Sequence, residues 1–337
     1  MLLVPSDEEH TWSIYNVIDD KLLNLKLSLS HEKRFSGSSQ GWLVVVNEDH
    51  TVTLYKPHFI LKDDICDANT SIQLPYLFPP LLDLTPDDDP DPDYGQFLIE
   101  VRDYHVWKAL ITADPVTNPD NCIIVVIYGF QRKMACIIYG KDKTWKEIEY
   151  RGMDMVHFKN QIYIVRNNGE LISFDPCNGT IELVAHHIEE MLEAMNFNST
   201  TNRYLVESCG ELLQIERYVA FHEDGYDRVT KIFRVFKLDF DTTEWIEIKD
   251  LGNVSLFIGD NSSISSLATE FNGWQKNCIY FTHDEAGLPT DTNKSCDLGV
   301  YNLESESFKL YYNLDSTTFQ RMYKRPPIWI IPLPNGY

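Results

Sequence analysis

The chain has 337 residues, of which 43% are hydrophobic, 12% aromatic and 24% charged, so it can bury a sizeable core and is not a disordered sequence. Its 51 acidic and 29 basic residues give a formal net charge of −22. This balance argues against binding to nucleic acid or to an anionic membrane, because both need a basic surface. It leaves solubility, or a basic protein partner, as the role of the charge.

The N-terminal residues, Met1 to Glu9, lack the basic flank and the apolar length of a signal peptide. No segment has the roughly 20 consecutive apolar residues of a membrane span. The seven cysteines are scattered without a close pair, which indicates free thiols in a reducing compartment. We therefore expect the protein in the cytoplasm, in the nucleus or in both.

From residue 15 onward, a short hairpin motif recurs along the chain. In each copy a large apolar residue is followed by Asp or Asn, and a second large apolar residue stands six positions after that polar one. Looser copies are Ile138-Tyr139 with Trp145, and residues 51–57 after the apolar run from Gly41 to Val46. The four closest copies are Tyr15-Asn16 with Leu22, Phe174-Asp175 with Ile181, Leu238-Asp239 with Trp245, and Tyr301-Asn302 with Phe308.

The residues between the two apolar positions are those that close a β-hairpin. In the copy at Asp175 they end in Asn178-Gly179, a pair that tolerates positive φ. Most copies also follow another apolar strand, such as residues 161–166, 204–207 or 278–282. Six such units of roughly 55 residues predict an all-β fold, a single β-propeller domain over residues 1–337. We expect six blades of short antiparallel strands, with five or seven as the alternatives.

Two segments interrupt the strand pattern. Residues 83–95 contain the run from Pro86 to Asp93, which is rich in aspartate and proline, and we expect an acidic, solvated loop insertion there. Residues His186 to Met195 combine good helix formers with apolar residues three and four positions apart. This spacing predicts one short inserted helix between two blades.

Two short patterns resemble chemical sites, and each has a simpler structural interpretation. The run from Gly37 to Gly41 matches the G-x-S-x-G of hydrolase nucleophile elbows, but an apolar strand follows it where that motif needs a helix. We interpret it as a turn leading into a strand. His186 and Glu190, with His187, offer two zinc ligands on one helical face, but no third ligand is indicated. We therefore expect a surface helix with incidental histidines.

The acidic insertion contains part of a calcium-binding pattern. Asp89, Asp91 and Asp93 alternate, and Glu100 falls at the twelfth position from Asp89, as an EF-hand loop requires. However, Tyr94 stands where that loop needs glycine. We expect a solvated loop here. Along the whole sequence we predict no catalytic residues, no cofactor and no metal site, and the partner-binding residues stay unassigned.

Several segments, in order along nearly the whole chain, resemble a plant family, the F-box-associated KIB-type β-propeller domain of kelch-like fold. The run from Gly37 to Val44 (GSSQGWLV) is similar to the early GSS-x-GWL signature of the family. Phe236 to Asp239 (FKLD), followed by Trp245, is similar to its F-K-L-D…W hairpin. The other segments that carry the resemblance are residues 156–163, 204–207, 277–281 and 326–330.

The resemblance implies a propeller that binds protein. In the family this domain commonly follows an N-terminal F-box, a helical module that docks on the Skp adaptor of a cullin ubiquitin ligase, while the propeller selects the protein to be ubiquitinated. Here Met1 to Pro5 already resembles the start of the propeller, and we detect no N-terminal F-box in this sequence. The Skp adaptor and the cullin are therefore not assigned as partners from the sequence.

We predict a protein-binding β-propeller that resembles the substrate-recognition domain of plant F-box proteins, and not an enzyme. The expected partner is a protein, such as a ubiquitination substrate, and neither nucleic acid nor a membrane. One alternative is a propeller enzyme or small-ligand binder that uses convergent polar groups in the central channel. Another is a scaffold or competitor that binds targets without delivering them to a ligase.

Overall fold

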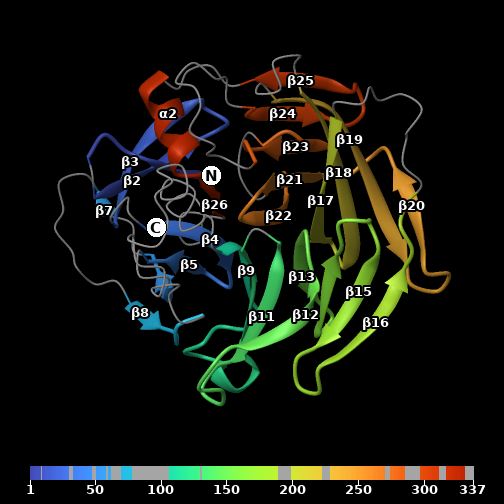
Figure 1. Cartoon of the computed structure of the whole chain (residues 1–337). Helices are drawn as coiled ribbons and strands as arrows, with labels where there is room; N and C mark the ends of the chain where they lie inside the picture. The colour runs from blue at the N-terminus through green and yellow to red at the C-terminus, as the bar shows by residue number, and fades with distance from the viewer. Residues whose placement is uncertain are drawn as a thin grey trace, which may run out of the picture.

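The computed structural model is a ring of six β-sheets around a central axis, which is a six-bladed β-propeller (Figure 1). The fold class and the blade count predicted from the sequence are confirmed. The sheets are numbered here as blades 1 to 6 in chain order. The structure describes residues 1–8, 10–29, 33–47, 51–57, 60–61, 70–77, 106–129, 131–188, 199–221, 228–269, 274–284, 297–310 and 316–330.

Blades 2 to 5 each contain four antiparallel strands that follow one another from the axis outward. Blade 2 has β4 (Arg34–Ser39), β5 (Trp42–Val46), β6 (Val52–Lys56) and β8 (Thr70–Gln73). Blade 3 has β9 (Val106–Ile111), β10 (Ile123–Tyr128), β11 (Lys133–Ile138) and β12 (Lys146–Arg151). Blade 4 has β13 (Asp154–Phe158), β14 (Gln161–Val165), β15 (Leu171–Asp175) and β16 (Thr180–Ala185). Blade 5 has β17 (Ser199–Ser208), β18 (Glu211–Phe221), β19 (Arg228–Asp239) and β20 (Glu244–Ile248).

Blade 1 closes the ring by joining the two ends of the described chain. Its innermost strand is β26 (Ile328–Trp329), which pairs with β1 (Leu2–Pro5) so that Trp329 lies opposite Leu2. The Trp329 indole also donates to the Ile258 carbonyl of blade 6 at 2.9 Å, which fixes the closing strand between the two blades. The other strands of blade 1 are β2 (Thr11–Asn16), β3 (Lys21–Ser28) and β7 (Ile60–Leu61).

Blade 6 departs from the simple meander. Its innermost strand is β22 (Ser262–Leu267), and β21 (Val254–Gly259) lies between β22 and β23 (Cys278–Phe281). β21 runs parallel to β23 and antiparallel to β22. The blade is completed by β24 (Gly299–Asn302) and β25 (Ser307–Leu310), so it has five strands, one more than blade 5.

The recurring sequence motif is the outer hairpin of four blades. In each of them the two large apolar residues lie directly opposite each other on neighbouring strands: Tyr15 and Leu22, Phe174 and Ile181, Leu238 and Trp245, and Tyr301 and Phe308. The polar residue then caps the turn, because its side-chain oxygen accepts a backbone N–H two or three residues later. The fourth residue after it takes a left-handed conformation, with φ of 52° at Asp20, 75° at Gly179, 58° at Thr243 and 51° at Glu306.

The core consists of six apolar clusters, one between each pair of neighbouring blades. Because side chains alternate along a strand, a strand between two blades must be apolar on both faces. In β10, Ile124 and Val126 pack toward blade 2, while Val125 and Ile127 pack toward blade 4. This arrangement explains the continuous apolar runs in the sequence.

The two ends of the ring carry different connections. The lower end is defined here as the end that carries the outer hairpins of blades 1 and 3 to 6, residues 17–20, 139–145, 176–179, 240–243 and 303–306. Longer connections at this end are residues 57–69, between β6 and β8, and residues 112–122, between β9 and β10. At the upper end, the second strand of blades 1 to 5 turns into the third, and successive blades are joined to one another. Three long connections, residues 74–105, 186–198 and 282–298, join strand ends at the upper end.

The described part of the chain contains one α-helix, α2 (Ser316–Lys324), which lies against β1 of blade 1. Arg321 on this helix pairs with Asp7 at 2.6 Å, and Met322 is buried beside Trp274 and Trp329. The sequence did not predict this helix. In the segment where a helix was predicted, residues 186–188 are not helical and residues 189–198 lie outside the described part. The described helices are all too short or too polar to span a bilayer.

Candidate partner-binding face

Blade 5 extends beyond its neighbours at the upper end. Its first three strands have 10, 11 and 12 residues, and they form the long ribbons at the right of Figure 1. The fourth strand, β20, pairs only with Val235 to Asp239, the lower part of β19. The upper parts of β17, β18 and β19 therefore form an arm of their own, which we call the blade 5 arm (residues 199–204, 217–221 and 228–234).

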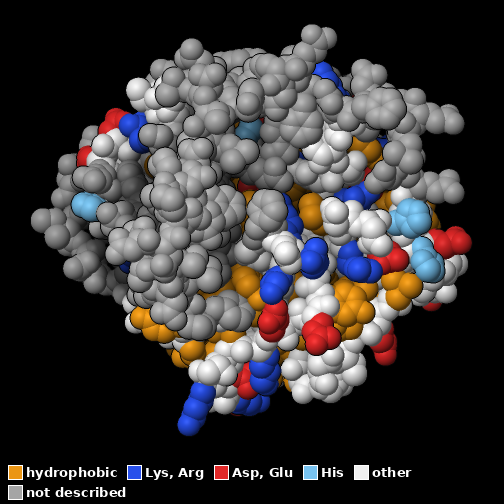
Figure 2. Space-filling view, viewed as in Figure 1, with side chains coloured by type: hydrophobic (Ala, Val, Ile, Leu, Met, Phe, Trp, Pro, Cys, Tyr) orange, Lys and Arg blue, Asp and Glu red, His pale blue; other side chains and the backbone are white. Residues whose placement is uncertain are grey.

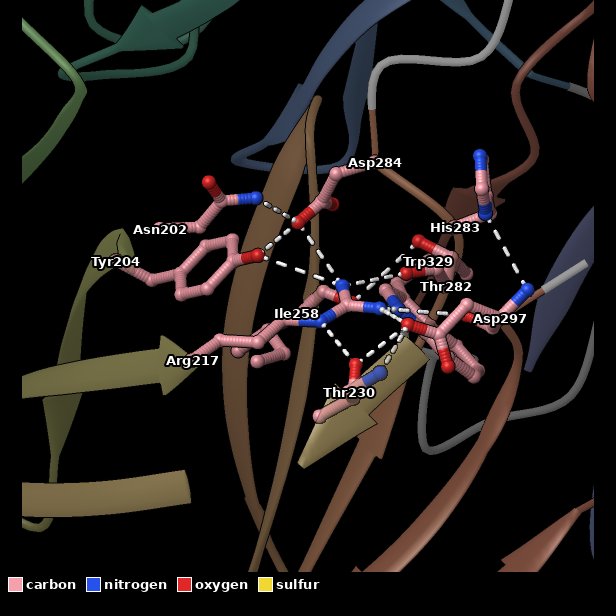
Figure 3. A network of polar contacts seen from close by, with 10 residues as sticks. All are labelled: Asn202, Tyr204, Arg217, Thr230, Ile258, Thr282, His283, Asp284, Asp297 and Trp329. Carbon is pink, nitrogen blue, oxygen red and sulfur yellow. Dashed lines mark hydrogen bonds and ion pairs between the residues drawn. The ribbon is translucent and has the colours of Figure 1, made fainter. Parts of the chain in front are cut away.

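A buried arginine at the base of this arm connects it to blade 6 (Figure 3). Arg217 is 1% exposed, and its guanidinium donates to the Asp284 carboxylate at 2.9 Å and to the Thr282 carbonyl at 2.7 Å. It also donates to the Asp297 carboxylate at 3.0 Å and to the Thr230 hydroxyl at 2.8 Å. Burial alone would lower the pKa of Arg217, but the two carboxylates raise it above its ordinary value, so the group is a permanent cation.

The two carboxylates stand at either end of one connection of blade 6. Asp284 follows β23 and Asp297 precedes β24, so the arginine fixes both ends of this connection against the arm. Asp284 also accepts hydrogen bonds from Asn202 and from the Tyr204 hydroxyl. Burial, followed by the charge of Asp284, raises the pKa of Tyr204 well above its usual value, so Tyr204 stays a hydrogen-bond donor.

A second buried arginine connects the opposite face of the arm to blade 4. Arg203 is 4% exposed and donates to Glu216 at 3.1 Å and to the Asn167 carbonyl of the β14–β15 turn at 2.9 Å. A side chain at Gly169 would come within 3.1 Å of this guanidinium, and the glycine has a φ of 85°. The turn of blade 4 and Arg203 therefore fit closely, and the arm is held on both faces.

The guanidinium groups of both arginines are buried and hydrogen-bonded within the protein, so their role is to hold the arm in place and not to bind a ligand. A charge pair buried to this extent is expensive to break, because the remaining partner is left as an uncompensated charge. The arm and the flanking strand ends of blades 4 and 6 therefore form one rigid support. Such a support can present a binding surface at the upper end with little loss of conformational entropy on binding.

The central channel is crossed by a separate polar cluster. The Lys108 ammonium of β9 lies 2.5 Å from the Asp154 carboxylate of β13 and donates to the Ser263 hydroxyl of β22 at 2.7 Å. Ser263 in turn donates to Asp154 at 2.9 Å, and the Leu205 backbone N–H of β17 donates to it at 3.0 Å. These groups satisfy one another and connect blades 3, 4, 5 and 6, so their arrangement is that of a structural link.

The residues considered in the sequence lie apart from these clusters. The run Gly37 to Gly41 covers the end of β4 and a two-residue turn into β5, which confirms its interpretation as a turn leading into a strand. The Ser39 hydroxyl donates to the Ile111 carbonyl of blade 3 at 2.8 Å. His186 and His187 are exposed after β16. Figure 2 shows histidine side chains on the molecular surface, some of them beside acidic side chains.

The acidic insertion at residues 83–95, Glu100 and Glu190 lie outside the described residues. Within the described ranges, no group of three or more His, Cys, Asp and Glu residues could hold a metal ion. Sequence reasoning missed Lys108, Asp154, Arg203 and Arg217. Of these, Lys108 had an available signal, because it is a charged residue within an otherwise apolar strand, VWKALI, and such a residue is rarely buried unless it is paired. Asp154, Arg203 and Arg217 lie beside polar residues or at the start of a strand and had no such signal.

A family model described as the KIB1-4 β-propeller matches residues 14–302. Among curated proteins, the chain is similar to F-box protein SKIP23 of Arabidopsis thaliana, with 24% identity over an alignment of 349 positions. The alignment covers 89% of this chain and 76% of the relative. It is also similar to the putative F-box protein At1g65770 of the same plant, with 27% identity, 65% coverage of this chain and 64% of the relative. F-box protein At2g17036 of that plant is 23% identical and is covered over 54% of its length. The chain thus spans between about half and three quarters of these relatives.

Solved structures with low similarity include BamB from Moraxella catarrhalis, with 11% identity, a TM-score of 0.33 and coverage of 91% of this chain and 78% of that chain. The N-terminal domain of Nup159 has 10% identity, a TM-score of 0.32 and coverage of 93% and 85%.

Proposed function

This chain belongs to the KIB1-4 β-propeller family, and on that basis we propose that it binds protein targets as a substrate receptor for a cullin-type ubiquitin ligase. Its curated relatives are named F-box proteins, and an F-box docks on the Skp adaptor of such a ligase. In this role the chain recruits the target, and the ligase makes the new bond. No catalytic group of its own is needed.

The observation that carries this proposal is the rigid arm of blade 5. Arg203 and Arg217 hold it against blades 4 and 6, and both are almost fully buried. A receptor benefits from such a base, because binding then costs less conformational entropy than it would on a mobile surface. We place the target on the upper end of the ring, over the arm and the neighbouring ends of blades 4 and 6.

The distribution of charge supports a cationic target. Of the 51 acidic and 29 basic residues, the described ranges contain 26 and 26, so the excess of acidic residues falls in the rest of the sequence. Opposite charge steers association, so the formal net charge of −22 suits a target with a basic surface.

The channel does not favour an enzyme or a small-ligand binder as the alternative. Both carboxylate oxygens of Asp154 already accept two hydrogen bonds or ion-pair contacts each, from Lys108, Ser263 and two backbone N–H groups. A competitor that binds targets without delivering them uses the same surface and differs only in its link to the ligase. The five described cysteines are unpaired, which supports a location in the cytoplasm or the nucleus.

The test is co-precipitation of the chain from plant extract, probed for the Skp adaptor and a cullin and followed by mass spectrometry. Recovery of both, together with a protein whose ubiquitination depends on this chain, is the expected result. Recovery of target proteins without the adaptor and the cullin supports the competitor and contradicts the ligase link. The absence of any saturable protein partner contradicts the binding role itself.

A further inference from the structure

A group of aromatic side chains is partly exposed at the lower end, between blades 4 and 5. Phe158 ends β13, Tyr163 lies on β14, and Phe240 lies on the hairpin after β19. The rings of Phe158 and Phe240 are stacked at 5.8 Å, and Tyr163 meets Phe240 edge-on at 5.9 Å. Phe240 is 38% exposed, whereas Phe158 below it is 4% exposed. The stack therefore has a buried base and an open outer face.

A lysine lies directly over this stack. The Lys159 ammonium is 4.7 Å from the ring centre of Phe158 and 5.5 Å from that of Phe240. The side chain is exposed, and none of the described carboxylates lies within ion-pair distance of it. A cation over two ring faces is attracted by their electron density, and its N–H groups on the far side point away from the rings. The ammonium is thus positioned by the rings and open to an acceptor.

A tight turn fixes the position of this lysine. Lys159 and Asn160 form a two-residue turn with φ values of 47° and 62°. The corresponding turns of blades 2 and 5 also have a residue with a side chain in the first position, Gln40 and Cys209, with φ values of 55° and 52°, and they have glycine in the second. Blade 4 differs in having Asn160 in the second position, and asparagine tolerates this conformation better than most residues with side chains.

We propose that Phe158, Lys159, Tyr163 and Phe240, which we call the lower aromatic patch, bind a protein segment in which one carboxylate stands beside a large apolar side chain. The carboxylate accepts from Lys159, and the apolar side chain packs on the exposed face of Phe240. Aromatic side chains are enriched at protein interfaces, and a cation held over their rings adds a positioned charge to the apolar surface. This surface is at the end of the ring opposite to the arm, so the inference does not rest on the proposed function.

The acidic residues around the patch limit the charge of the partner. Asp239 uses its carboxylate to accept the Asp241 backbone N–H at 2.9 Å, so that carboxylate is engaged within the hairpin. The Asp241 side chain is exposed on the same hairpin as Phe240. A strongly acidic segment would be repelled by Asp241, whereas a single carboxylate can be directed to Lys159. The partner segment therefore has one acidic residue next to one aromatic residue.

The test uses three peptides, Ac-Gly-Glu-Phe-Gly-NH2, its Gln-Phe analogue and its Glu-Ala analogue, added to the full chain with carbon-13 labels in lysine and phenylalanine. We expect saturable shifts of the Lys159 and Phe240 resonances with the Glu-Phe peptide, at a Kd on the order of 1 mM. The Gln-Phe and Glu-Ala peptides, which lack the charge and the ring, should each bind about fivefold more weakly.

Variants of the chain complete the test. Lys159→Met should weaken binding of the Glu-Phe peptide about fivefold, while Lys276→Met, a matched change of another exposed lysine, should leave it unchanged. Phe240→Ala should abolish the shift at Lys159, and its thermal melting curve serves as the check on folding. The proposal is overturned if the Glu-Phe peptide gives no saturable shift. Equal binding of the Gln-Phe peptide, or undiminished binding to Lys159→Met, overturns it as well.

Discussion

Replacing Arg217 with methionine tests the main stabilising contact of the blade 5 arm. The substitution keeps an unbranched apolar stem but removes the guanidinium, so it leaves Asp284 and Asp297 buried without the cation that they contact at 2.9 and 3.0 Å. Breaking a buried charge pair in this way costs about 3–5 kcal/mol, a large fraction of the 5–15 kcal/mol that stabilises a typical domain. We expect a loss of that size in the free energy of unfolding, measured by urea denaturation.

Two further variants show whether the cause is the buried charge. Lys237→Met removes a cation that pairs with Glu211 at 3.6 Å on the surface, and it should change the stability by less than about 1 kcal/mol. Adding Asp284→Asn and Asp297→Asn to Arg217→Met removes both uncompensated charges and should restore part of the lost stability. A loss below about 1 kcal/mol for Arg217→Met, or no recovery in the triple variant, would refute the reasoning.

Three other predictions concern the scaffold. Thr243 has a φ of 58° at the turn position where blade 4 has Gly179, so Thr243→Gly should stabilise the chain by about 1 kcal/mol in urea; a loss of stability would contradict the assigned strain. Both polar atoms of Gln214 are buried without a partner in the described structure, so Gln214→Met should raise the melting temperature, and a lower one would mean that the amide is satisfied. Burial raises the pKa of Cys122 and Cys136 from 9.0 to about 11, so these thiols stabilise the fold below pH 9 and that contribution is lost as pH rises toward 11. Both should therefore resist a thiol reagent at pH 8 in the folded chain, and rapid labelling would contradict their burial.

The repeated hairpins could be predicted from the sequence because they are local. The apolar pair, the polar cap and the turn lie within eight residues, so spacing alone identified pairs such as Tyr15 with Leu22 and Tyr301 with Phe308. The alternation of apolar residues likewise predicted the strands and, from their number, the six blades. The additional strand of blade 6 was not predicted, since β22 has the serine-rich sequence SSISSL, which resembles a loop.

The arginine contacts could not be predicted because they are distant in sequence. Arg217 meets Asp284 and Asp297 at separations of 67 and 80 residues, and a single sequence holds no information on which charges meet. The length of the arm was hidden for a related reason. The run from Ser199 to Ser208 begins with five polar residues, STTNR, so nothing in its sequence marks the part of the strand where blade 5 rises beyond its neighbours.

The most direct test of the central claim is to locate the partner on the ring by amine crosslinking and mass spectrometry of complexes purified from plant cells. Lys231 is exposed on the blade 5 arm, whereas Lys143 and Lys276 are exposed at the lower end. The proposed function predicts saturable crosslinks from a protein target to Lys231. Crosslinks from the target confined to Lys143 and Lys276 would contradict the placement of the target on the upper end.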